Sequence, residues 1–296
     1  MNVVSNFTHN YDEDPVRFFD FESLSNIINS EYLLFYGDPP SDKIFQESKL
    51  KKILFTLEEQ YSEEVGFIDP GEVYKYENYV DKILTITPTY IHNLKKRKYV
   101  FFPFNEKYIP SNKEKKYDIC YTGFANVKFM NELLTEFVNY NYAFVSFKEI
   151  IGVKNYFQNP KKYLRKKLFP KKYNFPNLLI NLPNLSYKNK LEIISESKVS
   201  LVHNQLNNGA PQLKSRTFES AFCKSLILVK KDKFNIIEDW FEEEKHFVYF
   251  ENKNDFKEKL NYILKNYSEF AYKIQNAYLH ALENYTTQKF VQKYLS

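Results

Sequence analysis

The fold of this chain is most tightly constrained by residues 198–250, where two apolar runs enclose a helical pattern. The first run, Val199 to Val202, is short and rich in β-branched residues, and the second spans Ser225 to Val229. A polar loop around Gly209 follows the first run. The segment after the loop predicts a helix, because its apolar residues share one face: Leu213, Phe218, Ala221 and Phe222. Buried strands that alternate with helices predict a parallel sheet.

Ligands of parallel sheets bind beyond the carboxyl ends of the strands. In this stretch that edge holds His203 and Asn204, followed by Lys214, Arg216 and Glu219 near the start of the predicted helix. A helix N-terminus with two cationic side chains suits a phosphate, and a glutamate one turn on can accept a hydrogen bond from a sugar hydroxyl. The alternative is that the three charged residues are solvated helix positions, and spacing alone does not decide between the two.

The string KSRTFESAFCKSLILV, which begins at Lys214, resembles the C-terminal half of GT-B glycosyltransferases. It is similar in particular to the spore-maturation-type group (glycosyl transferases group 1), whose pattern is roughly R-x-F-E-x-x-A-x-G-x-x-x-L. Arg216 and Glu219 match the donor-site Arg and Glu of that pattern. Two departures stand out: Cys223-Lys224 replaces the glycine after the helix, and Ile227 stands where retaining enzymes carry a second glutamate.

The resemblance implies an α/β fold of the GT-B type, in which two Rossmann-like domains face each other across a cleft and a C-terminal helix crosses back. Two βα series separated by a polar segment with Pro110 fit this architecture. The expected limits are an N-terminal domain at 1–103, a linker at 104–116, a nucleotide-sugar-binding domain at 117–285 and a returning helix at 286–296.

The patterns also predict individual elements. Expected strands cover 1–7, 32–36, 52–56, 80–86, 99–103, 117–121, 143–147 and 177–181, and expected helices cover 21–29, 127–140, 187–197, 255–266, 269–283 and 287–295. Ser186 and Thr286 stand where N-caps of two of these helices belong.

Composition excludes several other classes of protein. Of 296 residues 43% are hydrophobic, which is enough for real cores, and the net charge of +5 does not by itself imply nucleic-acid binding. Cys120 and Cys223 both lie in apolar surroundings, which predicts buried free thiols in a reducing compartment. The N-terminal residues are soon acidic and no apolar run approaches a membrane span, so we expect a cytoplasmic protein.

The expected donor site is assembled at the carboxyl edge of the second domain. Thr122-Gly123 forms a turn between a strand and a helix, which is a common phosphate environment, although a lone glycine can simply shape the turn. The scattered histidines and cysteines form no metal-ligand spacing, so a mechanism without metal or cofactor is expected. The charge of the leaving diphosphate must then be offset by cationic side chains. The donor-binding candidates are Gly123, His203, Asn204, Lys214, Arg216, Thr217 and Glu219.

An inverting transfer also needs a base to take the proton of the acceptor. Glu58, Glu59 and Asp38 follow strand runs of the first domain, and we rank Glu58 first and Asp38 next as catalytic candidates. Each of them is equally well explained as a surface carboxylate or a cap.

Residues 154–176 combine six lysines and one arginine from Lys161 to Lys172 with aromatic side chains. This composition suits peripheral contact with an anionic membrane surface at the inner face, or an anionic acceptor, whereas the simpler interpretation is a solvated loop.

The sequence thus predicts a metal-independent glycosyltransferase of hexosyl or deoxyhexosyl type. It would use a UDP- or GDP-linked sugar and a glycan or glycolipid acceptor, with no nucleic acid as partner. The alternatives are a catalytically silent nucleotide- or glycan-binding protein of the same fold, and a nucleic-acid-binding protein that uses residues 154–176.

Overall fold

The structure is a computed structural model of the 296-residue chain. The residues it describes are 3–5, 22–23, 31–36, 49–56, 60–62, 66–69, 79–86, 88, 96–123, 131–146, 182–183, 185–205, 209 and 211–295.

The chain folds into two compact units, each built from separate stretches of sequence. Unit 1 comprises Met1–Lys107, Asn204–Phe218 and Leu282–Ser296, and unit 2 comprises Tyr108–His203 and Glu219–Ala281. The domain limits expected from the sequence stay a prediction.

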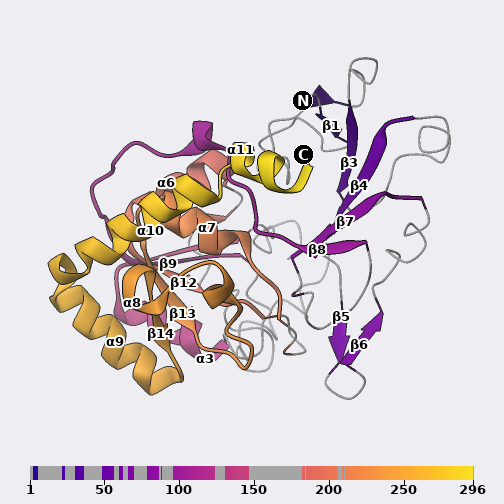
Figure 1. Ribbon diagram of the computed structural model, residues 1–296. Helices are drawn as coiled ribbons and strands as arrows, with labels where there is room; N and C mark the ends of the chain where they lie inside the picture. Colours follow the sequence, from indigo (N-terminus) through magenta and orange to yellow (C-terminus); the bar gives the residue numbers. More distant parts are fainter. Residues whose placement is uncertain are drawn as a thin grey trace, which may run out of the picture. The chain divides into compact units, whose positions relative to one another are not determined.

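Unit 1 contains a six-stranded sheet in which every pairing is parallel (Figure 1). Its order is β2-β1-β3-β4-β7-β8. The strands are β1 (Val3–Ser5), β2 (Glu22–Ser23), β3 (Tyr32–Tyr36), β4 (Lys51–Thr56), β7 (Lys82–Thr85) and β8 (Arg97–Tyr99). An antiparallel hairpin of β5 (Gln60–Ser62) and β6 (Gly66–Asp69) was not expected. The buried core of the sheet includes Leu33, Phe35, Leu54, Val80 and Ile83.

Two of the expected elements in this unit were wrong. Residues 22–23 form strand β2, paired with β1, inside the range 21–29 where a helix was expected, and the rest of that range lies outside the described residues. The expected strand at 99–103 ends at Tyr99 instead; Val100 to Phe104 are buried, and Phe104 bridges Thr286 rather than extending β8. In both cases pairing with a neighbouring strand, which local sequence does not encode, decided the state.

The C-terminal helix α11 (Thr287–Phe290) packs within unit 1. The hydroxyl of Thr286 accepts a hydrogen bond from the Lys289 N–H at 3.3 Å, which confirms the expected N-cap. Phe104 and Thr286 form a parallel bridge, and the ring of Phe290 packs at 5.5 Å from that of Phe101. Apolar and aromatic burial therefore anchors the end of the chain in this unit.

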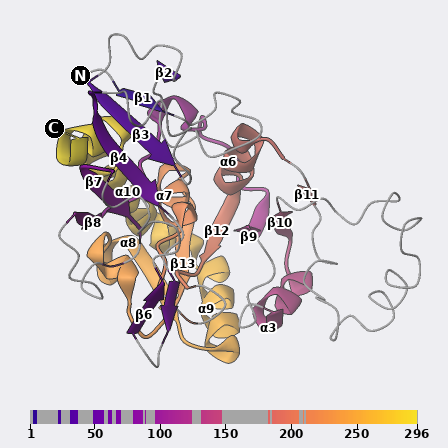
Figure 2. The same ribbon diagram turned by 90° about the vertical axis from the view of Figure 1, so that its right-hand side faces the viewer.

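Unit 2 contains a second parallel six-stranded sheet, of order β11-β10-β9-β12-β13-β14 (Figure 2). The strands are β9 (Tyr117–Thr122), β10 (Tyr142–Ser146), β11 (Leu182–Pro183), β12 (Ser197–Val202), β13 (Leu226–Lys230) and β14 (Phe247–Phe250). The helices are α3 (Asn131–Leu134), α6 (Tyr187–Ser195), α8 (Glu243–His246) and α9 (Lys253–Lys265). Helix α7 (Ser215–Phe222) ends in this unit, and α10 (Ala271–Asn284) begins in it. Short 3₁₀ segments and a terminal π turn occur along the chain at Glu106–Tyr108, Thr135–Asn139, Ile236–Asp239, Tyr267–Phe270 and Val291–Leu295.

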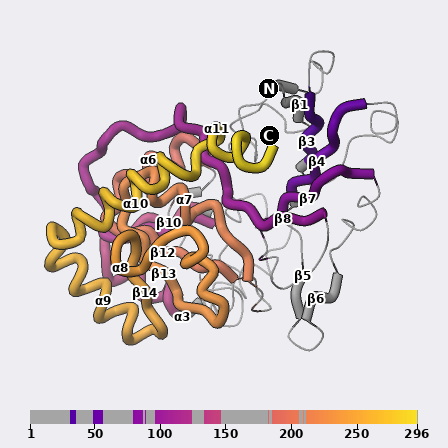
Figure 3. The backbone as a smooth tube through the Cα atoms, viewed as in Figure 1, coloured from indigo at the N-terminus to yellow at the C-terminus, as the bar shows by residue number. Residues whose placement is uncertain are grey.

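The second sheet is buried on both faces, as its uninterrupted apolar strands predicted. One face contributes residues such as Ile119 and Leu201 to an apolar core that also contains Leu260 of α9. The other face carries small polar groups, including Ser200, whose Oγ accepts a 2.7 Å hydrogen bond from Ser220 of α7. Figure 3 follows the backbone from α8 through β14 into α9. The two faces therefore differ in chemistry, because helices with different buried residues cover them.

Helix α7 is followed by a residue whose backbone conformation is left-handed although it is not glycine. Lys224 has φ 51°, the Lys224 N–H bonds Ala221 O, and the Ser225 N–H bonds Ser220 O, both at 3.1 Å, which is the Schellman pattern. Lys224 thus takes the conformation that the family glycine would supply. The partly buried ammonium of Lys115 donates to Lys224 O at 2.7 Å, and desolvation lowers its pKa to about 8.

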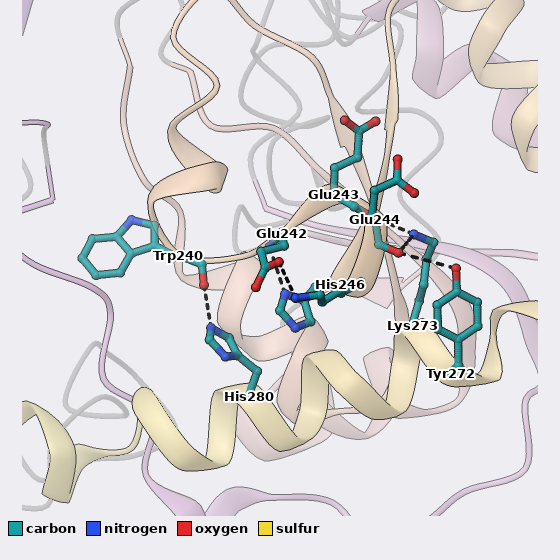
Figure 4. A network of polar contacts seen from close by, with 9 residues as sticks. Trp240, Glu242, Glu243, Glu244, His246, Tyr272, Lys273 and His280 are labelled. Carbon is teal, nitrogen blue, oxygen red and sulfur yellow. Dashed lines mark hydrogen bonds and ion pairs between the residues drawn. The ribbon is translucent and has the colours of Figure 1, made fainter.

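A network of polar contacts connects α10 to residues 240–246 within unit 2 (Figure 4). His280 on α10 lies 2.8 Å from Trp240 O, and the ammonium of Lys273 donates to Glu243 O at 2.9 Å. The ring of His246 stacks on that of His280 with centroids 4.6 Å apart. The segment before β14 is therefore fixed by the side chains of one helix.

Both cysteines are buried free thiols, as the sequence predicted. Burial raises the pKa of both groups, so Cys120 and Cys223 are neutral members of the core rather than reactive thiolates.

Candidate functional site

The strand order of unit 2 reverses between β9 and β12, which creates a topological switch point. From β9 the chain proceeds outward to β10 and β11, then returns to β12 on the other side and continues to β13 and β14. In open parallel sheets, ligands bind beyond the carboxyl ends of the strands at such a point. The residues at these two strand ends are Thr122, Gly123 and His203. Gly123 has φ 142°, a conformation that favours glycine.

His203 is paired with a residue that the sequence did not single out. The hydroxyl of Tyr121 lies 2.9 Å from Nε2 of His203, and the two rings stack at 5.9 Å with an interplanar angle of 22°. Both side chains are buried. This contact fixes the orientation of the imidazole at the switch point, because it constrains both the ring plane and one ring nitrogen.

Glu219 of α7 is held by a second residue that sequence reasoning missed. The Lys190 ammonium of α6 lies 2.5 Å from Glu219 Oε2, and the side chains are only 3% and 1% exposed. Lys190 is also 5.4 Å from the centroid of the Tyr187 ring. A lysine on the buried stripe of α6, between Tyr187 and Leu191, is the sequence signal that could have revealed the pair.

In unit 1, Asn204 organises the backbone that leads into α7. Its Oδ1 accepts hydrogen bonds from the Lys214 N–H at 3.1 Å and from the hydroxyl of Thr217 at 3.2 Å. The Asn204 side chain therefore caps the helix from ten residues away in sequence. The residue is 1% exposed, and no hydrogen-bond partner for its Nδ2 exists in the described part of the chain.

Lys214 and Arg216 supply the positive charge near the start of α7. The Lys214 ammonium bonds Oε1 of Gln212, and its pKa is lowered to about 7, first by burial and then by the charge of Arg216. Lys214 can therefore gain a proton near neutral pH when an anion arrives. Arg216 is partly exposed, and it lies three residues before Glu219 on α7, a spacing that puts both on one helix face.

The predicted site residues fall into three groups. Gly123, His203 and Glu219 belong to unit 2, whereas Asn204, Lys214, Arg216 and Thr217 belong to unit 1. Asp38, Glu58, Glu59 and the segment 154–176 lie outside the described residues.

Neither a metal cluster nor a membrane-spanning helix is present among the described residues. Among the described residues, no three His, Cys, Asp or Glu side chains form a group that could hold a metal ion. No helix within the described ranges is long and apolar enough to cross a bilayer.

Comparison with solved structures defines the class of fold as GT-B. TarM matches with a TM-score of 0.58 at 15% identity, over 89% of this chain and 54% of TarM. Sucrose-phosphate synthase from Thermosynechococcus elongatus matches with 0.60 at 10% identity, over 90% and 73% of the two chains. Anabaena Alr3699/HepE, solved with UDP and glucose, matches with 0.59 at 9% identity, over 89% and 76%. The chain therefore has the α/β GT-B fold expected from its sequence, and it spans about half the length of TarM.

The family comparison agrees with the fold. The family model described as "Glycosyl transferase-like" matches residues 161–296, which include α7 with Arg216 and Glu219. The resemblance to GT-B glycosyltransferases is thus confirmed for the C-terminal part of the chain. Among curated protein sequences, none matches.

Proposed function

We propose that this chain is a glycosyltransferase that moves a sugar from a UDP- or GDP-linked donor to a glycan or glycolipid acceptor without a bound metal. The observation that carries the proposal is α7, which follows the central strand β12 of a GT-B fold and brings Arg216 and Glu219 to one helix face. Arg216 and Lys214 would offset the charge of the leaving diphosphate, and Glu219 would accept a bond from a hydroxyl of the nucleotide ribose.

The solved relatives support this choice of donor. Alr3699/HepE was solved in complex with UDP-glucose, and a mutant of S. aureus TarM was solved with fondaparinux, α-GlcNAc-glycerol and UDP. By analogy we assign a nucleotide-linked hexose or deoxyhexose and a glycan acceptor to this chain, acting in the cytoplasm, with residues 154–176 as the candidate contact to an inner membrane face.

A thermal-shift panel of UDP, GDP, ADP and their sugar conjugates tests the donor site, because a ligand of the native state stabilises it by mass action. In calorimetry, Arg216→Ala should weaken binding of the selected nucleotide by about 1.5–3 kcal/mol, the range for a hydrogen bond to a charged group. Unchanged affinity in a folded Arg216→Ala protein removes this residue from the site.

Turnover is tested separately, with slow hydrolysis of the sugar nucleotide as the readout and EDTA as the test of metal independence. Glu58→Gln should lower turnover about 10²–10⁴-fold while nucleotide binding survives, with Glu59→Gln as the matched control. If Glu58→Gln turns over like wild type, Asp38 is the next base to test.

Two observations favour the other candidate, a protein that binds a nucleotide but catalyses no transfer. Glu219 is almost fully buried against Lys190, and Ile227 occupies the position of the second glutamate. Nucleotide binding without any hydrolysis of a sugar nucleotide would select this alternative.

A further inference from the structure

The hydroxyl of Thr122 is a buried polar group that no described residue of the chain binds. Thr122 is the last residue of β9 and is 3% exposed. Its backbone belongs to the ladder with β10, where Thr122 pairs with Val145. Within the described ranges, no residue forms a hydrogen bond with its Oγ1. The side chain therefore carries a donor and an acceptor that the described part of the chain leaves unsatisfied.

Such a group is unfavourable for folding. A buried hydroxyl without a hydrogen bond loses its interactions with water and receives nothing in return. Valine has nearly the same shape and at least the same preference for strands, so a purely structural position would be served as well by valine. The hydroxyl thus makes folding less favourable, and packing gives no reason for it. Such a loss of stability is typical of residues that bind a ligand.

The position of Thr122 indicates what kind of ligand. It ends a central strand at the topological switch point, the place where parallel sheets bind ligands. Gly123 follows with φ 142° and donates its N–H to Val145 O at 2.9 Å, so the backbone turns away there without a side chain. Glycine at the end of a first strand lets a phosphate approach the backbone closely.

The neighbouring strand end is already occupied by an internal contact. His203 follows β12, and its Nε2 lies 2.9 Å from the Tyr121 hydroxyl. Tyr121 and Thr122 are consecutive, so their side chains leave opposite faces of the strand. Tyr121 accordingly positions His203, whereas the hydroxyl of Thr122 is left for a different partner.

We propose that Thr122 is a binding residue, whose hydroxyl donates a hydrogen bond to a phosphate oxygen of the nucleoside diphosphate in the donor. This inference rests on the proposed function, since it names a contact within the same donor site. The sequence indicates a phosphate environment for the turn Thr122-Gly123 and names Gly123 as the candidate; the inference adds a specific role for the Thr122 hydroxyl.

The test removes the hydroxyl and keeps the shape. Thr122→Val should bind UDP, or GDP if the wild-type protein prefers it, about 10- to 100-fold more weakly in calorimetry. Thr122→Ser should restore the wild-type affinity, because it restores the donor. Uridine and guanosine, which lack phosphates, should bind both proteins alike.

Stability provides the second readout and separates binding from a structural role. Thr122→Val should melt at the same temperature as wild type or higher, since it deletes an unsatisfied group. The matched control is Ser200→Ala on β12, whose hydroxyl is satisfied by Ser220 at 2.7 Å. Ser200→Ala should melt at a lower temperature and bind UDP like wild type. Thr122→Ala, which also removes the hydroxyl, repeats the binding measurement if the valine variant does not fold.

Each other outcome overturns the inference. UDP and GDP affinities that are unchanged in Thr122→Val exclude the contact, although the proposed function stands. A lower melting temperature together with unchanged affinity shows that the hydroxyl is used inside the fold. Wild-type protein that binds no nucleoside diphosphate overturns the proposed function, and this contact with it.

Discussion

The Nζ atom of Lys190 lies 2.5 Å from Oε2 of Glu219, and the two side chains are 3% and 1% exposed. They come from α6 and α7, and each occupies a helix position that would ordinarily hold an apolar residue. Removing both charges from water is costly, and the attraction between them offsets that cost only while both are present. The pair therefore connects α7, the helix of the candidate donor site, to α6, the helix that precedes β12.

Breaking this pair should be strongly destabilising. Lys190→Met leaves the Glu219 carboxylate buried without its cation, and we expect the free energy of unfolding to fall by about 3–5 kcal/mol in urea titrations. The matched control is Lys245→Met, which breaks a 2.7 Å pair with Glu242 whose side chains are both 60% exposed, and it should cost about 0–1 kcal/mol. Equal losses in the two variants would contradict the assignment.

Substitutions of Asn204 should distinguish its role as a helix cap from a role in anion binding. Asn204→Asp keeps the acceptor for the Lys214 N–H and the Thr217 hydroxyl and so keeps the cap, but it buries a carboxylate at a position that is 1% exposed, so the free energy of unfolding should fall. The new negative charge should weaken nucleotide binding at least about 10-fold by repelling the phosphates. Asn204→Ala, which loses the cap, should cost about 1–2 kcal/mol. An aspartate variant with wild-type nucleotide affinity would place Asn204 outside the phosphate site.

His246 predicts a pH dependence of stability. Its Nδ1 accepts a 2.9 Å bond from the Glu242 N–H, and burial, followed by the adjacent His280, lowers its pKa from 6.5 to about 4. Glu242 opposes the shift, whereas Lys245 and Lys273 add to it. Between these two pH values the unfolded chain binds the proton and the folded chain does not, so this contribution to stability is present above pH 6.5 and lost as the pH falls toward 4.

Urea titrations at several pH values between 7.5 and 4.5 provide the measurement. His246→Asn keeps an acceptor near the Glu242 N–H but does not titrate, so the slope of stability against pH should be shallower than in wild type. An identical slope in the two proteins would assign the acid sensitivity to other groups.

The backbone conformation of Lys224 predicts an unusual order of stability among its variants. Its φ of 51° is accessible to glycine without strain but costs other residues about 1–2 kcal/mol. Lys224→Gly should therefore be more stable than Lys224→Ala by about 1 kcal/mol in thermal unfolding, even though both lose the contact of the ammonium with the Tyr278 ring at 4.3 Å. At Lys231, which lacks a positive φ, alanine should be at least as stable as glycine. If the glycine variant were more stable than the alanine variant at both positions, the result would argue against a left-handed conformation at Lys224.

The sequence by itself determined the secondary structure around the candidate donor site. The apolar run at 199–202 lies in β12, the run at 225–229 lies in β13 from Leu226 on, and the capping hydroxyls of Ser186 and Thr286 are used as expected. These features are local, since each depends on side-chain periodicity or on a bond three residues away. The pattern around Arg216 and Glu219 likewise sufficed to identify the GT-B fold.

Only the tertiary structure decided which residues surround that pattern. Lys190 meets Glu219 across 29 residues, Tyr121 meets His203 across 82, and Asn204 caps α7 from a preceding loop. Such contacts depend on strand order and on the packing of helices onto one sheet, which local propensities do not encode. The lack of a partner for the Thr122 hydroxyl among the described residues follows from the same packing, because only the fold decides which groups reach a buried side chain.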